Sequence, residues 1–68
     1  MSLVVRVIPS GEVKVIDLSS PIKVVDLLRM LGYNPEAVVV VRGGEVLTED
    51  RVVRPGEEVL IYMAYSGG

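Results

Sequence analysis

The sequence contains no cysteine and no histidine. Without cysteine there is no disulfide, no thiolate metal site and no cysteine nucleophile, and without histidine the usual general base and the commonest metal ligand are missing. Glutamine is also absent and Asn34 is the only asparagine, a scarcity that leans towards a thermophilic source or is chance in so short a chain. We therefore expect a protein that is not an enzyme, needs no cofactor and binds no metal.

Basic stripes and long apolar runs are missing as well. The seven lysines and arginines are scattered among nine acidic residues, and the net charge is -2. A scattered basic set does not neutralise a phosphate backbone, so we expect no direct binding to nucleic acid. Every apolar run is far shorter than the roughly 20 residues that span a bilayer, and no signal peptide is visible. We expect a cytoplasmic protein that does not contact membranes.

What the chain does contain is β-branched residues, which make up much of its first segment. Residues 3–8 are bounded by Pro9-Ser10-Gly11, and residues 12–16 follow at once, a pattern that predicts a β-hairpin. Side chains alternate between the two faces of a strand. We expect one face to carry Leu3, Val5, Val7, Val13 and Val15, and the wetter face to carry Arg6 and Lys14.

A helix of about three turns is predicted next, because the apolar period changes from two to 3.6. Ser20 can cap its first amides, and Pro21 suits the first helical position. Gly32 is expected to end the helix in the left-handed conformation, with Tyr33 folding back on the last turn. The buried stripe is predicted to contain Val24, Leu27, Leu28 and Leu31.

The second half of the chain predicts further strands. Residues 37–41 form a β-branched run, Arg42-Gly43-Gly44-Glu45 makes a tight turn, Pro55-Gly56 fits a type II turn, and residues 58–63 form the last strand. For one helix to cover a sheet that contains both the first and the last strand, these two strands must pair. The sequence therefore predicts an α+β fold of the β-grasp type, a mixed four- to five-stranded sheet with one main helix across one face.

The order of these segments resembles a known family over the whole chain. Three stretches and the ending are similar to the ubiquitin-like sulfur carriers MoaD and ThiS and to the small archaeal modifier proteins. The stretches are residues 24–32, 39–47 and 54–59, and the ending is Tyr62-Met63-Ala64-Tyr65-Ser66-Gly67-Gly68. Within that family, residues 31–43 and the Ser66-Gly67-Gly68 ending look most like the TtuB type, which feeds sulfur to tRNA thiolation. The resemblance implies a β-grasp domain over residues 1–63 and a flexible C-terminal diglycine tail over residues 64–68.

The diglycine ending is the candidate functional group. Glycine has no Cβ, so Gly67 and Gly68 can enter a narrow channel and leave the last carbonyl open to attack. Taken alone, the pair is equally consistent with an ordinary flexible end. The resemblance implies that a ubiquitin-activating-type enzyme uses ATP to adenylate Gly68, and that Tyr65, Ser66 and Gly67 accompany it into the active site. The adenylate then takes sulfur or passes to a lysine amine.

A docking patch for that enzyme is predicted on the sheet face opposite the helix. If Val39 and Val41 point towards the helix, then Val40 points away from it. An exposed apolar patch of this kind marks interaction sites, although these positions could also be ordinary sheet residues. The predicted patch contains Val4, Ile8, Val40, Leu60 and Tyr62, rimmed by Arg6 and Arg42.

Three functions are compatible with the sequence. The first is a sulfur carrier that supplies tRNA thiolation or the synthesis of molybdopterin or thiamine, with sulfur donor and acceptor enzymes as partners. The second is a protein modifier that forms isopeptide bonds with lysines of target proteins, and the third is a noncovalent interaction module. Lys14 and Lys23 could accept such a modifier, but are more simply solvating charges. We expect a monomer.

Overall fold

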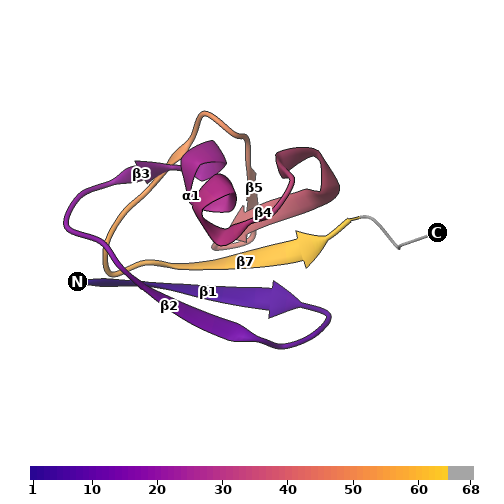
Figure 1. The fold of residues 1–68 in the computed structure, drawn as a ribbon, viewed down its shortest axis with the longest axis horizontal. Coiled ribbons are helices and arrows are strands. Elements are labelled where there is room, and N and C mark those ends of the chain that lie inside the picture. The colour runs from indigo at the N-terminus through magenta and orange to yellow at the C-terminus, as the bar shows by residue number, and fades with distance from the viewer. Residues whose placement is uncertain (65–68) are drawn as a thin grey trace.

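The computed structural model describes residues 1–64 as a sheet with one helix lying across it (Figure 1). The main helix, α1, spans Val24–Leu31, and a short 3-10 turn spans Pro35–Ala37. Within these residues no helix is long and apolar enough to cross a membrane. The strands are β1 Ser2–Ile8, β2 Val13–Asp17, β3 Ile22–Lys23, β4 Val38–Arg42, β5 Glu45–Leu47, β6 Val52–Val53 and β7 Glu58–Met63.

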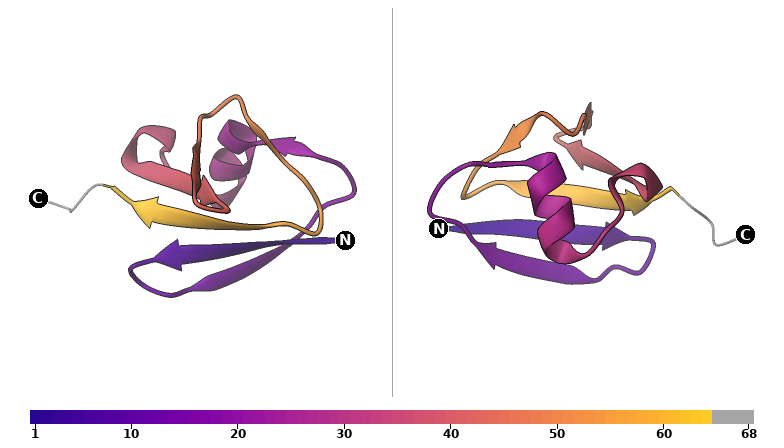
Figure 2. Two further views of the ribbon diagram at one scale, coloured as in Figure 1. Left: turned by 180° about the vertical axis from the view of Figure 1, so that it is seen from behind. Right: turned by 45° about the horizontal axis from the view of Figure 1, so that its top comes forward.

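Five of the strands form one mixed sheet in the order β2-β1-β7-β4-β5, and β3 pairs with β6 in a separate two-stranded sheet. The first and last strands of the chain, β1 and β7, run parallel at the middle of the larger sheet, and the other pairs in it are antiparallel. All views show α1 on one side only of this sheet (Figure 2). The predicted β-grasp fold is confirmed, with five strands in the main sheet.

The core lies between α1 and the sheet face beneath it. Leu27 and Leu28 are fully buried, as predicted from the helical stripe, and Leu31 is partly buried against the same cluster. Opposite them, β1 and β7 contribute alternate side chains, since successive residues of a strand point to opposite faces. The fully buried residues of these two strands are Leu3, Val5, Val59 and Ile61.

The start of α1 differs from the prediction. The helix begins at Val24, Lys23 precedes it without a side-chain cap, and Ser20 plays no capping role. Two amides of the first turn are instead satisfied by backbone carbonyls of a distant segment, Val24 N–H by Arg51 over 2.9 Å and Val25 N–H by Glu49 over 3.1 Å. Pairing of β3 with β6 draws the preceding residues into a strand, so the helix has eight residues, about two turns.

The end of α1 is as predicted. Gly32 has φ 86°, in the left-handed region, and the N–H of Tyr33 donates to the carbonyl of Leu28 over 2.8 Å. This hydrogen bond gives the Leu28 carbonyl a partner, which carbonyls in the last turn of a helix otherwise lack. The Tyr33 side chain packs against the core cluster.

The register of the β1–β2 hairpin overturns the predicted burial of Val13 and Val15. Val5 lies opposite Lys14, and directly opposed residues of two paired strands share a face, so Lys14 lies on the helix side of β2. Val13 and Val15 therefore point away from the helix, with 46% and 64% of their surface exposed. The turn between the strands sets this register, and a shift of one residue exchanges the two faces.

Lys14 occupies the position that was predicted for a buried valine. Its Nζ lies 5.5 Å from the centre of the Tyr33 ring and 3.9 Å from a carboxylate oxygen of Glu12. A lysine can lay its aliphatic stem along apolar surface and keep its ammonium group in water, and the ring face attracts the cation. Lys14 is therefore tolerated at the edge of the core.

Leu28→Ala is expected to lower the free energy of unfolding by about 2–5 kcal/mol, because the change leaves a cavity between the sheet and α1, the helix that covers it. Leu31→Ala, at a partly buried position, should cost less. Denaturant unfolding followed by circular dichroism measures both changes. Met30 is 54% exposed on the same helix, and Met30→Ala is the matched control, with an expected change within about 0.5 kcal/mol. If Leu28→Ala unfolded like the wild type, the assigned helix face would be wrong.

Candidate docking face and tail

The sheet face that α1 leaves uncovered, which we call the outer face, is apolar across its whole width. On β1 and β7 its residues alternate with the buried ones, and cross-strand pairing extends it to both edges. Among its central positions the charged residues are Arg6 on β1 and Glu58 on β7. The apolar members are Val13 and Val15 on β2, Val4 and Ile8 on β1, Leu60 and Tyr62 on β7, Val39 and Val41 on β4, and Val46 on β5.

The registers arrange these side chains in rows across the strands. One row runs from Val13 through Arg6 and Leu60 to Val41 and Val46. A neighbouring row, at the end where β7 stops, joins Ile8, Tyr62 and Val39. Side chains in such rows lie close enough to form one continuous surface. The outer face is therefore larger than the patch that the sequence predicted.

The predicted orientation of β4 is wrong. Val40 is only 2% exposed and lies opposite Ile61 in the core, whereas Val39 and Val41 lie on the outer face. In a run of consecutive valines, composition gives no signal for which alternate set is buried, because the two sets have the same side chain. Val40 is thus removed from the predicted patch. Val4, Ile8, Leu60, Tyr62 and Arg6 lie on the outer face as predicted, and their role in docking stays a prediction.

Arg6 forms an ion pair with Glu58 on the outer face. Its Nε donates to a carboxylate oxygen of Glu58 over 3.2 Å, and about half of each side chain is exposed. The two residues stand on the two central strands, β1 and β7, with apolar side chains on both flanks. An exposed pair of this kind contributes little to stability, about 0–1 kcal/mol. Its position makes it a candidate for recognition.

Arg42 does not border this face, contrary to the prediction. Two residues beyond Val40 on β4, it shares the helix side of the strand. Its Nη1 donates to the carbonyl of Val52 over 2.9 Å and to a carboxylate oxygen of Glu57 over 3.2 Å. Arg42 therefore fastens the end of β4 to the segment that leads into β7.

Glu57 completes this junction. The same carboxylate oxygen accepts the backbone N–H of Arg54 over 2.8 Å. That hydrogen bond and the nearby Arg42 guanidinium favour the ionised form and lower the pKa of Glu57 below its ordinary value of 4.5. The contacts hold the turn at Pro55-Gly56, where the chain enters the last strand.

Beyond β7 the described chain ends at Ala64, whose N–H donates to the carbonyl of Ala37 over 3.0 Å. The predicted attachment residue Gly68 and the tail residues Tyr65, Ser66 and Gly67 lie outside the described residues. Within residues 1–64 the fold encloses no pocket, and no group of three or more acidic side chains is placed to hold a metal ion. The strand that leads to the tail is the central one of the sheet.

Sequence reasoning missed five outer-face residues: Val13, Val15, Val39, Val41 and Val46. All five are valines on strands that flank the central pair. On β2 the charge of Lys14 indicates the solvent side, but its aliphatic stem can also lie along the edge of a core. For the valines of β4 there was no such signal.

Comparison with known proteins identifies the family. Residues 1–61 match the family model of small archaeal modifier protein 2. The chain belongs to this family. Members of the small archaeal modifier protein 2 family are ubiquitin-like carriers and modifiers rather than enzymes.

Two further similarities agree with this assignment. The chain is 46% identical over 43 residues to the sulfur carrier protein TtuB of Thermus thermophilus, a match that covers 63% of this chain and 66% of that carrier, just under two thirds of its length. The fold is similar to the NMR structure of a computationally designed protein based on human erythrocytic ubiquitin, with a TM-score of 0.68 and 17% identity over 98% of this chain and 95% of the design. At that identity the likeness shows the ubiquitin-like fold alone.

Glu57→Gln is expected to lower the melting temperature at about pH 7, because a neutral amide loses the charge-assisted contacts to Arg42 and Arg54. A lowered folded-state pKa adds stability above the unfolded value of 4.5, and that stability is lost as the pH falls through the folded pKa. The gap between wild type and variant should therefore shrink on acidification to about pH 3. Melts followed by circular dichroism measure the gap. A gap that stayed constant across this range would contradict the assigned role of the Glu57 carboxylate.

Proposed function

We propose that this chain is a ubiquitin-like sulfur carrier whose C-terminal carboxylate, on Gly68, is activated and converted to a thiocarboxylate. The observation that carries the proposal is the 46% identity with a protein named as a sulfur carrier, within a chain whose family consists of carriers and modifiers. The central strand β7 leads directly towards the diglycine. Transfer of the sulfur to tRNA thiolation, or to the synthesis of molybdopterin or thiamine, would complete the function.

The chemistry requires a partner, because a carboxylate is a poor electrophile. In the proposed first step, a Gly68 carboxylate oxygen attacks the α-phosphorus of ATP in a ubiquitin-activating-type enzyme, and pyrophosphate leaves. A hydrosulfide equivalent from a sulfur-donor enzyme then attacks the carbonyl carbon of the acyl adenylate, and AMP leaves. The product is a thiocarboxylate that an acceptor enzyme consumes. The contribution of this chain is a small, unhindered acyl group.

The outer face is proposed as the surface that the activating enzyme recognises. Exposed apolar surface of this extent on a small domain is typical of interaction sites. Tyr62 and its neighbours Ile8 and Val39 lie at the end of β7, beside the point where the tail begins. Five residues follow Met63, and an extended chain of that length reaches at most about 16–18 Å. Docking at this end of the face would bring the carboxylate within reach of a buried nucleotide.

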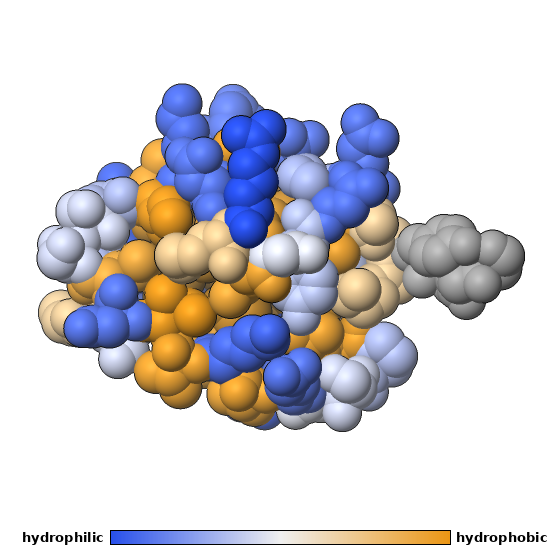
Figure 3. Space-filling view, viewed as in Figure 1, coloured by the Kyte–Doolittle hydropathy of each residue, from blue (hydrophilic) through white to orange (hydrophobic). Residues whose placement is uncertain are grey.

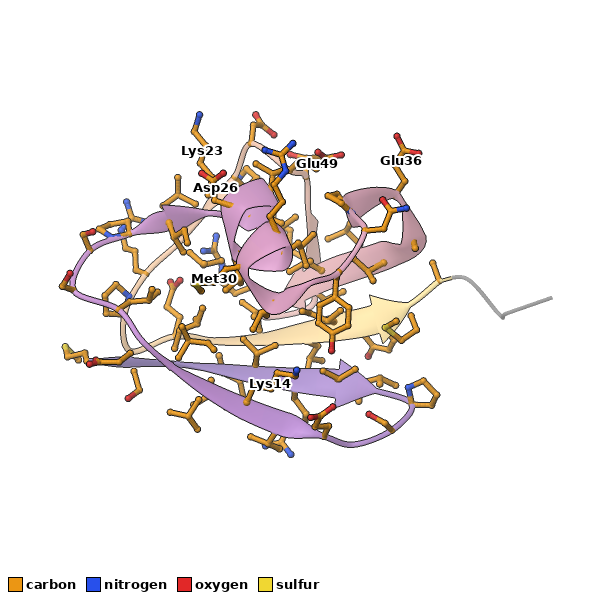
Figure 4. All side chains as sticks on the ribbon, in the orientation of Figure 1. Lys14, Lys23, Asp26, Met30, Glu36 and Glu49 are labelled. Atoms are coloured by element: carbon orange, nitrogen blue, oxygen red, sulfur yellow. The ribbon has the colours of Figure 1, made fainter. Side chains whose placement is uncertain are left out.

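Protein modification is the second candidate function, and the match to a modifier family favours it. The same acyl adenylate would lose AMP to the amine of a target lysine and form an isopeptide bond. Lys23 projects outward at the start of α1, whereas Lys14 lies between the hairpin and the helix (Figure 4). Sulfur transfer and conjugation begin with the same activation, so one chain can serve both.

Deletion of Gly67-Gly68, or addition of one residue after Gly68, is expected to abolish adenylation by the activating enzyme. Both changes move or block the reacting carboxylate, and neither touches the core of residues 1–64. Formation of the acyl adenylate is measured with labelled ATP, and thermal melts serve as the control for folding. A truncated protein that still accepted AMP would rule out Gly68 as the activated residue.

Tyr62→Asp is expected to slow adenylation by about tenfold or more, because it places a charge in an apolar contact next to the tail and removes an aromatic side chain of the type that dominates interfaces. Met30→Asp is the matched control, since Met30 is similarly exposed on the opposite side of the molecule, and it should leave the rate unchanged. Both rates are measured below saturation, on proteins whose folding is checked by circular dichroism. Equal rates for wild type and Tyr62→Asp would remove the outer face from the docking site.

A further inference from the structure

Strand β2 forms one border of the main sheet, and its outward side is open to another strand. The order β2-β1-β7-β4-β5 gives β2 a single neighbour, and β2 lies at the border of the ribbon (Figure 1). Backbone groups along such a border can pair with a strand of another molecule, including a second copy of the same chain. We propose that Lys14, on the helix side of β2, prevents this border from pairing with a second copy. This role is independent of the chemistry at Gly68.

The ladder between β1 and β2 shows which backbone groups of β2 point outward. Near the hairpin turn, the N–H of Val7 donates to the carbonyl of Glu12 over 2.8 Å. Hydrogen-bonded pairs alternate with non-bonded pairs in an antiparallel ladder, so the backbone groups of Lys14 and Ile16 also point towards β1. The N–H and C=O groups of the residues between them point away from β1, to the side where residues 1–64 provide no further strand. These outward residues are Val13, Val15 and Asp17.

Apart from Lys14, the composition of β2 favours pairing with another strand. Val13 and Val15 are exposed on the outer face, and β-branched residues are favourable in strands. Apolar surface is seen over the half of the molecule where β1 and β2 lie (Figure 3). A second copy beside β2 would shelter both valines from water and would supply partners for the outward backbone groups. Without a charge at this border, we would therefore expect two copies to pair.

Lys14 opposes pairing in every register that uses two or more of the outward residues. Two copies related by a two-fold axis pair antiparallel, with outward residues opposite outward residues. In the register that places Val15 opposite the other copy's Val15, each Lys14 lies opposite the other copy's Ile16. A shift by two residues in one direction places the two lysines opposite each other, and in the other direction it places Lys14 opposite the buried Leu18. The ammonium group therefore meets either a second ammonium group or an apolar side chain.

Both kinds of contact are unfavourable for Lys14. Its side chain is 30% exposed on the helix side of β2 (Figure 4), and a strand beside β2 would cover part of that exposed surface. A cation that loses water without gaining a partner raises the free energy, and like charges directly opposite each other destabilise a strand pair. The register that would place Lys14 opposite the other copy's Glu12 leaves Val13 as the only outward residue that is paired.

The opposite border of the sheet is protected in a different way. Strand β5 has only three residues, and Glu45 at its start forms an ion pair with Arg51 over 3.4 Å. Short strands and charged side chains both limit pairing at a border. Strand β2 has five residues, so its protection depends on the charge that points to the helix side.

The test removes the charge and keeps the shape. Lys14→Met retains an unbranched apolar stem, and we expect it to self-associate at least about tenfold more tightly than the wild type. Amide signals of the ¹⁵N-labelled protein, followed by NMR from about 0.05 mM to about 2 mM, measure this association. The signals of the outward residues Val13, Val15 and Asp17 should move with concentration more than that of Ile16, whose N–H points towards β1. Lys14→Val is a second uncharged variant and should behave in the same way.

Two matched controls exist on the same chain. Lys14→Arg keeps the charge at the border, and Lys23→Met removes one positive charge from an exposed position outside the main sheet. Both should associate no more tightly than the wild type. The proposal is overturned if neither uncharged variant at position 14 associates more tightly than the wild type, or if Lys14→Arg associates as tightly as Lys14→Met. Signal changes centred on β7 instead of β2 would also overturn it. Because no activating enzyme is present, this result is separate from the test of Gly68.

Discussion

The parallel pairing of β1 with β7 is the constraint on which the rest of the structure depends. It places the first and last strands of the chain at the middle of the sheet, with Val5 beside Val59 and Val7 beside Ile61 in the core. A parallel pair needs a long crossover, and residues 9–57 provide it. The same pairing makes Met63 the last residue of the sheet's central strand.

One helix can cover only one face of this sheet. The covered face takes the fully buried leucines, valines and isoleucine, while the outer face keeps its own valines together with Leu60 and Tyr62. Covering that face with protein would remove more apolar surface from water, at about 25 cal/mol per Å². We propose that the uncovered face and the tail act together. In this proposal the face supplies the binding energy for a partner, and the tail supplies the carboxylate on which the partner acts.

Much of this fold could be predicted from residue patterns, because the strongest signals are local. The helical stripe, Gly32 as the stop, and the turns at Gly43-Gly44 and Pro55-Gly56 all occur where the sequence placed them. The errors arose where tertiary contacts decide. The carbonyls of Glu49 and Arg51 set the start of α1, and strand register chose which residues of β2 and β4 face the helix. In an unbroken valine run such as residues 38–41, no side chain distinguishes the two faces.

The central claim is that the Gly68 carboxylate is the functional group of this chain. The most direct measurement is the intact mass of the protein isolated from its own cells, since replacing a carboxylate oxygen by sulfur adds the mass difference between the two atoms, and an isopeptide bond joins a second protein. We predict a population with the sulfur increment, a population attached to other proteins, or both. Protein found only with a free, unmodified carboxylate, in cells in which the activating enzyme is present, would contradict it.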